Sequence, residues 1–209
     1  MFLGRTADLA FLENQYHQKS FSFVPIYGRR RVGKTTLIKM HLKGKPFIYF
    51  QTFETSTLPN LAGLSKEINR LIFGTLGTSL PPYSSLNEAL EVVTKYIKDH
   101  PCALVIDEFP YLAKVIPESS SIIQYFIDHY WKEVEHFQLI LCGSTISFME
   151  RQVLGHKSPL YGRKTGQIKL KPFSFKETIS YFPSFPIERI FGFYGITGGV
   201  PQILRVYRP

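Results

Sequence analysis

The segment 28–35 has the residue types and the spacing that bind a polyphosphate. It reads GRRRVGKT and fits the pattern G-x-x-x-x-G-K-[ST] at every position. Gly28 and Gly33 leave backbone N–H groups unobstructed, so that several can converge on one tight anionic group. Lys34 would supply a mobile cation for the β and γ oxygens, and Thr35 would offer a hydroxyl to Mg²⁺. We therefore predict a phosphate-binding loop for a nucleoside triphosphate and Mg²⁺.

Three arginines occupy the middle of this loop. A cradle made of backbone amides does not need their side chains, so the simplest interpretation leaves them solvated, although they could also face a partner or another subunit. All residues of the loop and the one after it are nevertheless predicted to line the nucleotide site: Gly28, Arg29, Arg30, Arg31, Val32, Gly33, Lys34, Thr35 and Thr36.

A pair of acids follows the apolar run ALVID at 103–107. Asp107 would emerge at the carboxyl end of a strand, where open α/β sheets bind their ligands, and would hold the magnesium shell beside Thr35. Glu108 is then placed to orient and deprotonate a water for attack on the γ-phosphate. Taken alone, such a pair could simply cap the next turn, but the phosphate loop upstream favours the catalytic interpretation.

Ser144 ends another apolar run, FQLILCGS at 137–144. We expect this strand beside the ALVID strand, with Ser144 approaching the γ-phosphate and the attacking water. A serine in that place could sense the phosphate, or it could be the N-cap of a helix over 145–154. The sequence leaves both roles open.

Strands and helices alternate along the chain. We predict strands over 21–27, 46–52, 103–107, 137–144 and 166–173. We predict helices over 6–18, 58–76, 86–99, 119–135, 145–154, 174–182 and 186–195, one from the phosphate loop through about 43, and a short one after Pro201. Strands that are apolar on both sides and separated by helices indicate a parallel sheet covered on both faces.

Composition sets the remaining limits. The 209 residues suit one domain with a small lid, and 44% hydrophobic with 20% charged residues allow a full core. No stretch approaches the roughly 20 apolar residues of a membrane span. Arg5 and Asp8 interrupt the N-terminus, unlike a signal peptide, so we expect a cytoplasmic protein. The net charge of +9 favours anionic partners without choosing between nucleotides and nucleic acid.

Beyond single motifs, the chain resembles the archaeal-type P-loop ATPases of the STAND branch of the ASCE division, near AAA+ initiator-type ATPases. The resemblance rests on YGRRRVGKT, LVIDEF, LILCGS, SPLYGRKTGQIKLKPFSF and GGVPQILR. The opening FLGRTADL is similar to the family's hydrophobic-Gly-Arg-x-x-Glu-Leu signature, with Asp8 in place of Glu. The resemblance implies a three-layer P-loop NTPase fold of class α/β, with a parallel five-stranded sheet in the order 5-1-4-3-2 and a small C-terminal helical lid.

The resemblance also implies roles for residues outside the phosphate loop. Gly4 and Arg5 match the opening signature, which lies near the nucleotide base. Pro201, with Gly199, matches a Gly-x-Pro motif that contacts adenine from the lid. Arg163 lies where related ATPases carry an arginine that acts on the γ-phosphate, in cis or from a neighbouring subunit; it could also be an ordinary surface cation.

The same resemblance predicts the domain organisation. Residues 1–173 would form the ATPase core, and residues 174–209 would begin a helical lid. Family members usually continue into a winged-helix domain, so DNA contact would depend on segments that follow this one. Self-association is a further expectation.

Three functions fit these observations. The first is Mg²⁺-dependent ATP binding and slow hydrolysis, used as a nucleotide-driven switch. The second is a regulatory module that binds ATP or ADP without turnover in isolation. The third is a DNA-associated, initiator-like ATPase. A small-molecule kinase fits less well, because Glu108 directly after Asp107 indicates water as the acceptor. The resemblance favours adenine, and the guanine motif Asn-Lys-x-Asp is absent from the sequence.

Overall fold

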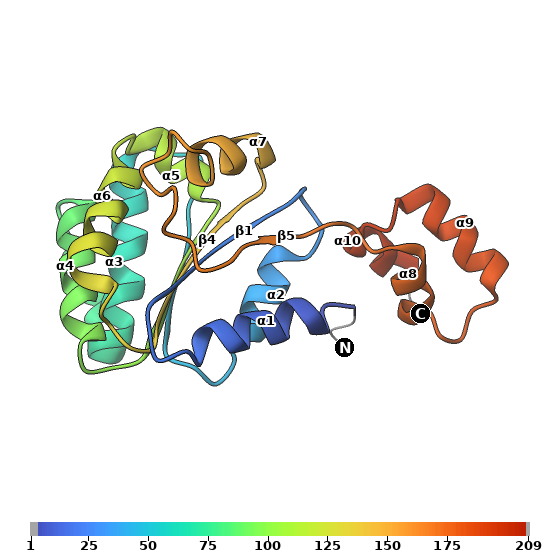
Figure 1. Ribbon diagram of the computed structural model, residues 1–209, viewed down its shortest axis with the longest axis horizontal. Helices are drawn as coiled ribbons and strands as arrows, with labels where there is room; N and C mark the ends of the chain where they lie inside the picture. Colours follow the sequence, from blue (N-terminus) through green and yellow to red (C-terminus); the bar gives the residue numbers. More distant parts are fainter. Residues whose placement is uncertain (1–3, 208–209) are drawn as a thin grey trace.

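The described part of the chain forms five parallel strands, which make the middle of three layers (Figure 1). The computed structural model describes residues 4–207, without the side chains of residues 76 and 78. The strands are β1 (Ser22–Tyr27), β2 (Phe47–Gln51), β3 (Cys102–Asp107), β4 (Phe137–Gly143) and β5 (Ile168–Lys169). Their order, β2-β3-β4-β1-β5, confirms the predicted α/β sheet. Every position of β1, β3 and β4 is buried, as helices on both faces require.

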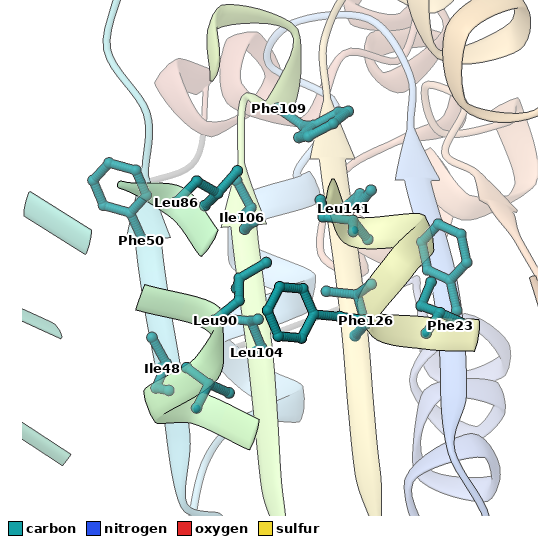
Figure 2. Packing of buried hydrophobic residues seen from close by; sticks show 14 of the residues in the cluster. Phe23, Ile48, Phe50, Leu86, Leu90, Leu104, Ile106, Phe109, Phe126 and Leu141 are labelled. Atoms are coloured by element: carbon teal, nitrogen blue, oxygen red, sulfur yellow. The ribbon is translucent and has the colours of Figure 1, made fainter. Parts of the chain in front are cut away.

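The larger hydrophobic core lies on one face of this sheet. It is covered by α3 (Thr57–Phe73), α4 (Leu86–Ile97), α5 (Phe109–Val115) and α6 (Ser119–Phe126). Figure 2 shows Leu104 and Ile106 of β3 and Leu141 of β4 on this face, together with Leu90 and Phe126 from the helices. Each such buried side chain contributes roughly 1.5–3 kcal/mol of transfer free energy. The face therefore anchors β3 and β4, whose carboxyl ends carry Asp107 and Ser144.

The opposite face is covered by α1 (Thr6–Tyr16) and α2 (Lys34–His41). Leu37 and Ile38 of α2 belong to a second cluster of buried side chains that includes Val105 and Ile140 of the sheet. Since α2 follows β1 directly through the phosphate loop, this packing fixes the N-terminus of α2 at the carboxyl edge of the sheet.

The C-terminal helices form a third apolar cluster at one end of the molecule (Figure 1). They are α8 (Phe175–Tyr181), α9 (Ile187–Thr197) and α10 (Pro201–Leu204). Ser174 and Glu177 form a capping box at the start of α8, which marks its first residue. The amide of Phe173 donates to the carbonyl oxygen of Gly199 across 2.8 Å, so the segment that leaves the sheet is tied to the turn before α10. The predicted division at residue 173 stays a prediction, and Leu3 of the opening signature lies outside the described residues.

Several predicted elements are shorter than expected. The alternation over 166–173 yields only Ile168–Lys169, although the amide of Leu170 still donates to Tyr27 of β1 across 2.7 Å. The ladder does not continue, because the carbonyl of Lys171 accepts from Arg5 instead. Pro172 has no amide to continue a ladder. The helix over 58–76 ends at Phe73, because Gly74 adopts a φ of 65°.

Two other helical predictions were wrong in part. α6 ends at Phe126 and continues as a π-helical turn, Ile127–Trp131. The helix over 145–154 is α7 (Ile146–Phe148) followed by a π-helical turn, Met149–Val153. α5, directly after Glu108, was not predicted at all. Among the described residues, no helix has the length and apolarity to cross a bilayer.

Candidate functional site

The phosphate loop has a backbone that only glycine tolerates at two positions. A Cβ on Gly28 would lie 2.1 Å from the carbonyl oxygen of Leu170, so the residue directly after β5 leaves no room for a side chain there. Gly33 has a φ of 97° and stands at the N-cap of α2. Because glycine has no side chain to cap the helix, the first amides of α2 are available to an anion, and the helix dipole favours negative charge there.

Lys34 is buried in this loop, with 6% of its surface exposed. Its Nζ donates to the carbonyl oxygens of Gly28 at 2.9 Å and Arg29 at 3.0 Å, and to the hydroxyl of Ser144 at 2.8 Å. These acceptors are all neutral. A phosphate oxygen would be a stronger partner for the ammonium, because it adds the attraction between opposite charges to the hydrogen bond.

Asp107 ends β3 with both carboxylate oxygens engaged. Oδ2 accepts from Thr35 Oγ1 at 3.0 Å and from the phenol of Tyr49, and Oδ1 accepts from the amide of Glu108 at 2.9 Å. Burial, followed by the nearby Asp107 carboxylate, raises the pKa of Tyr49, so the phenol remains a donor. The structure thus brings Thr35 and Asp107 together, as the sequence predicted.

The oxygens of Thr35 and Asp107 fit a hard divalent cation. Mg²⁺ prefers oxygen ligands and is usually held by one or two protein groups together with substrate phosphates and water. Among residues 4–207, no group of three or more His, Cys, Asp and Glu side chains gathers into a metal cage. A site of the magnesium–nucleotide kind does not need one.

Glu108 is held at the mouth of the site in a strained conformation. Its φ of 54° and ψ of 44° are left-handed, which costs a non-glycine residue about 1–3 kcal/mol. Its carboxylate accepts from the amide of Ser144 at 3.0 Å and from the Ser144 hydroxyl. The N-cap of α7 is Thr145, so the side chain of Ser144 serves Lys34 and Glu108 instead of a helix end.

A cavity of about 860 Å³ opens between this loop and the C-terminal helices. Ligand pockets of about 300–1,000 Å³ hold small molecules and cofactors. Of the site residues that the sequence predicted, residues 30–36, Arg5, Glu108, Ser144 and Pro201 line this cavity. Residues that the sequence did not single out also line it: Met40, Gln51, Tyr111, Phe173, Tyr181, Gln202 and Arg205.

Part of the cavity lining combines aromatic rings with Arg5. The Arg5 guanidinium lies 4.9 Å from the ring centroid of Phe173 and donates to the carbonyl oxygens of Val32, at 3.4 Å, and Lys171. Burial lowers the pKa of Arg5, against the opposite effect of Asp8. Gly4 is not a lining residue: a Cβ there would lie 3.0 Å from the Phe173 ring.

α10 borders the same cavity through Pro201 and Gln202. The amide of Gln202 lies 3.4 Å from the carbonyl oxygen of Arg31, which ties α10 to the phosphate loop. Arg30 spans the other side of the loop, where its Nη2 donates to the hydroxyl of Tyr111 on α5 across 2.6 Å. Arg29 contributes its carbonyl oxygen to Lys34, and its side chain is exposed.

The structure does not bring Arg163 to this site. Its guanidinium binds both carboxylate oxygens of Asp128, at 2.9 and 2.5 Å, and donates to the carbonyl of Pro159. This ion pair lowers the pKa of Asp128 to about 2. The amide of nearby Thr165 donates to Phe23, five residues before Gly28, or about 16 Å along the strand. A cis role at the γ-phosphate is therefore not seen in this geometry.

Tyr49 is the residue at the acidic end that the sequence interpretation missed. It pairs with Val105 in the register of β2 and β3, two residues before Asp107. The predicted strand order, which places β2 beside β3, was the signal that could have found it.

Comparisons with known proteins identify the family to which the chain belongs. The model of the ATPase domain predominantly from Archaea matches residues 2–206. An uncharacterized protein of Methanocaldococcus jannaschii is 34% identical over 204 residues, which cover 98% of this chain and 43% of that protein.

Solved structures show the same fold. The Walker-type ATPase of Pyrococcus abyssi superposes with a TM-score of 0.73 at 21% identity, covering 99% of this chain and 66% of that one. The Aeropyrum pernix ORC1 protein, solved in complex with DNA, gives a TM-score of 0.63 at 15% identity, covering 98% of this chain and 58% of that one. The chain thus spans less than two thirds of these relatives. With its family model matched from residue 2 to residue 206, the chain belongs to the ATPase domains found predominantly in Archaea.

Proposed function

We propose that this chain binds ATP with Mg²⁺ at the phosphate loop and hydrolyses it slowly, as a nucleotide-driven switch. One observation carries the proposal: Ser144 joins the cation of the loop to the acid after β3. Its hydroxyl accepts from Lys34 across 2.8 Å, and its amide donates to Glu108 across 3.0 Å. A phosphate-binding cation and a candidate base thus face one cavity.

The phosphate loop and Asp107 would bind the nucleotide and its Mg²⁺. The first amides of α2 would hold the β- and γ-phosphates, and Lys34 would exchange neutral acceptors for phosphate oxygens. Thr35 and Asp107 would hold Mg²⁺. When bound there, the ion would supply positive charge that offsets the charge of the phosphates. Phe173, Tyr181 and Pro201 supply the apolar surface for an adenine ring, beside Arg5.

Hydrolysis would depend on Glu108. Its carboxylate would orient a water in line with the γ-phosphate and accept the proton of that water. Ser144 already places one donor on each oxygen of the carboxylate, and the remaining acceptor capacity of these oxygens is available to a water. The orientation of the candidate base therefore depends on Ser144, which supports a link between the state of the phosphates and the position of this serine.

The test compares Glu108→Gln with the parent chain. We expect phosphate release to fall at least about 100-fold, the usual contribution of a general base, while ATP affinity stays within a few-fold. Glu133→Gln, at an exposed position, is the matched control and should behave like the parent. If Glu108→Gln hydrolysed ATP as fast as the parent, Glu108 would not be the base.

A second candidate function is a regulatory module that binds ATP or ADP without turnover in isolation. Arg163 favours it, since the one arginine expected at the γ-phosphate is bonded to Asp128. Calorimetric binding of ATP without phosphate release by the isolated chain would support this alternative. Turnover that returns at high protein concentration would instead indicate an arginine supplied by a second copy.

A further inference from the structure

Tyr49 makes a contact with Asp107 that is not part of the phosphate-loop motif. Its hydroxyl donates to Oδ2 of Asp107 across 2.5 Å. The same oxygen accepts from the Thr35 hydroxyl across 3.0 Å. Two donors from different elements, β2 and α2, thus meet on one carboxylate oxygen.

The position of Tyr49 follows from the sheet. β2 is an edge strand, and Tyr49 lies beside Val105 in the parallel register. Side chains alternate along a strand, so Val105 and Asp107 point to the same face. Tyr49 packs against the cluster of buried side chains on that face, under α2, and its ring extends toward Asp107. The first turn of α2 brings Thr35 to the same point.

Each hydrogen-bond donor on Asp107 restricts the orientation of its carboxylate. The amide of Glu108 fixes Oδ1 at 2.9 Å. On Oδ2, Tyr49 shares the position with Thr35, so the carboxylate plane is set without relying on the threonine alone. Neither Tyr49 nor Asp107 is among the residues that line the cavity, whereas Thr35 is. Any effect of Tyr49 on a ligand must therefore pass through Asp107 and Thr35.

We infer that Tyr49 is a positioning residue for the magnesium site. It orients Asp107 so that the Thr35 hydroxyl can donate to the carboxylate and present its oxygen to the ion. The inference rests on the proposed function, because it requires that nucleotide binds here with Mg²⁺. Partners that orient metal-binding groups typically change metal affinity 10- to 100-fold when they are removed.

The test measures binding rather than turnover. The affinity of a β,γ-imido analogue of ATP is determined by calorimetry in EDTA and at increasing Mg²⁺ concentrations. For Tyr49→Phe, which keeps the ring and its packing, we expect unchanged affinity in EDTA. The Mg²⁺ concentration that gives half of the full increase in analogue affinity should rise about 10-fold.

Two further variants sharpen the test. Tyr96→Phe removes a hydroxyl from a half-buried tyrosine of α4, on the other face of the sheet, and should match the parent. Asp107→Asn should reduce the Mg²⁺ effect by itself, and adding Tyr49→Phe to it should cause little further change, since both act through one carboxylate.

The outcomes separate the inference from the proposed function. An Mg²⁺ response of Tyr49→Phe identical to that of the parent overturns the inference and leaves the proposed function standing. A loss of analogue affinity in EDTA as large as the loss in Mg²⁺ also overturns the inference, because Tyr49 would then shape the pocket rather than the metal site. A parent chain that does not bind the analogue at all contradicts the proposed function, and the inference falls with it.

Discussion

Lys34 of the phosphate loop donates a hydrogen bond of 2.8 Å to the hydroxyl of Ser144 at the end of β4. The same hydroxyl donates to Glu108, so one serine couples the phosphate-binding cation to the candidate base. Any phosphate that draws Lys34 away from Ser144 changes the hydrogen bonding of Glu108. Under the proposed function, the nucleotide state would thereby be transmitted across the sheet edge through a single side chain.

Ser144→Ala removes this coupling. Hydrogen bonds to charged groups contribute about 1.5–3 kcal/mol, so we expect hydrolysis to fall roughly 10- to 100-fold. ATP affinity should change less than about threefold, because the loop amides and Lys34 remain. Phosphate release and calorimetry measure the two quantities. Ser147→Ala, at an exposed position of α7, is the control. Equal losses in affinity and rate would contradict a role for Ser144 in positioning the base.

Lys34→Met should separate binding from stability. Lys34 is a buried cation whose hydrogen-bond acceptors are neutral, and burying a charge without an ionic partner costs free energy. We expect an unchanged or higher free energy of unfolding without nucleotide, measured in urea, and a loss of ATP affinity of about 100-fold or more. The exposed Lys43→Met should alter neither. Full ATP affinity in Lys34→Met would be incompatible with the proposed site.

Gly28→Ala tests the backbone of the loop. The new Cβ would lie 2.1 Å from the carbonyl oxygen of Leu170, so either the loop or the segment directly after β5 must move. We expect a loss of roughly 2–4 kcal/mol in unfolding free energy and weaker ATP binding. Gly192→Ala is the matched control: no atom lies within 4 Å of its added Cβ, and it sits inside α9. It should stabilise the chain by up to about 1 kcal/mol. Equal stability of the two variants would contradict the close approach at Gly28.

The pair of Asp128 with Arg163 predicts a pH dependence of stability. Arg163 first, and then Lys132, lower the pKa of Asp128 from 3.8 to about 2. A depressed carboxyl pKa stabilises the folded state above the unfolded pKa, and this contribution is lost as the pH falls from about 4 to about 2. We expect Arg163→Gln to reduce the change in unfolding free energy across this pH window by roughly 1 kcal/mol. The effect is small because solvent screens the pair and Lys132 Nζ remains 3.0 Å from Asp128 Oδ1. An unchanged slope would mean that the pair does not form in solution.

The same variant tests the predicted catalytic role of Arg163. Because the guanidinium is bonded to Asp128, we expect Arg163→Gln to hydrolyse ATP at the parent rate in dilute solution. The exposed Arg151→Gln serves as the control. A deficit that appears only at high protein concentration would indicate that Arg163 acts on a neighbouring copy. A deficit at every concentration would contradict the position seen here.

Much of the fold and part of the site could be predicted from the sequence. The loop pattern and the strand-end acid place Thr35 and Asp107 at one edge, because parallel strands in this topology end together at the ligand side. The strand order followed from the family resemblance and is confirmed. The short helix after Glu108 was missed because a left-handed residue starts it, a conformation that no propensity encodes.

Side-chain partners were the part that the sequence could not provide. Arg163 and Asp128 are 35 residues apart, and Tyr49 and Asp107 are 58 apart. Which of several cations meets a given carboxylate depends on where loops cross the sheet, and a single sequence carries no periodic signal for that. The length of β5 was also not predictable, because its alternating pattern predicts a strand over 166–173 and only Ile168–Lys169 pairs with β1.

The central claim is that the amides of 28–35 wrap a polyphosphate while Thr35 and Asp107 secure its magnesium. A crystal structure of the chain grown with a non-hydrolysable ATP analogue and Mg²⁺ tests it most directly. We expect the triphosphate at the N-terminus of α2, with Lys34 on its oxygens and the ion beside Thr35. A cavity that remains empty at saturating nucleotide, or an analogue bound at another surface, would contradict it.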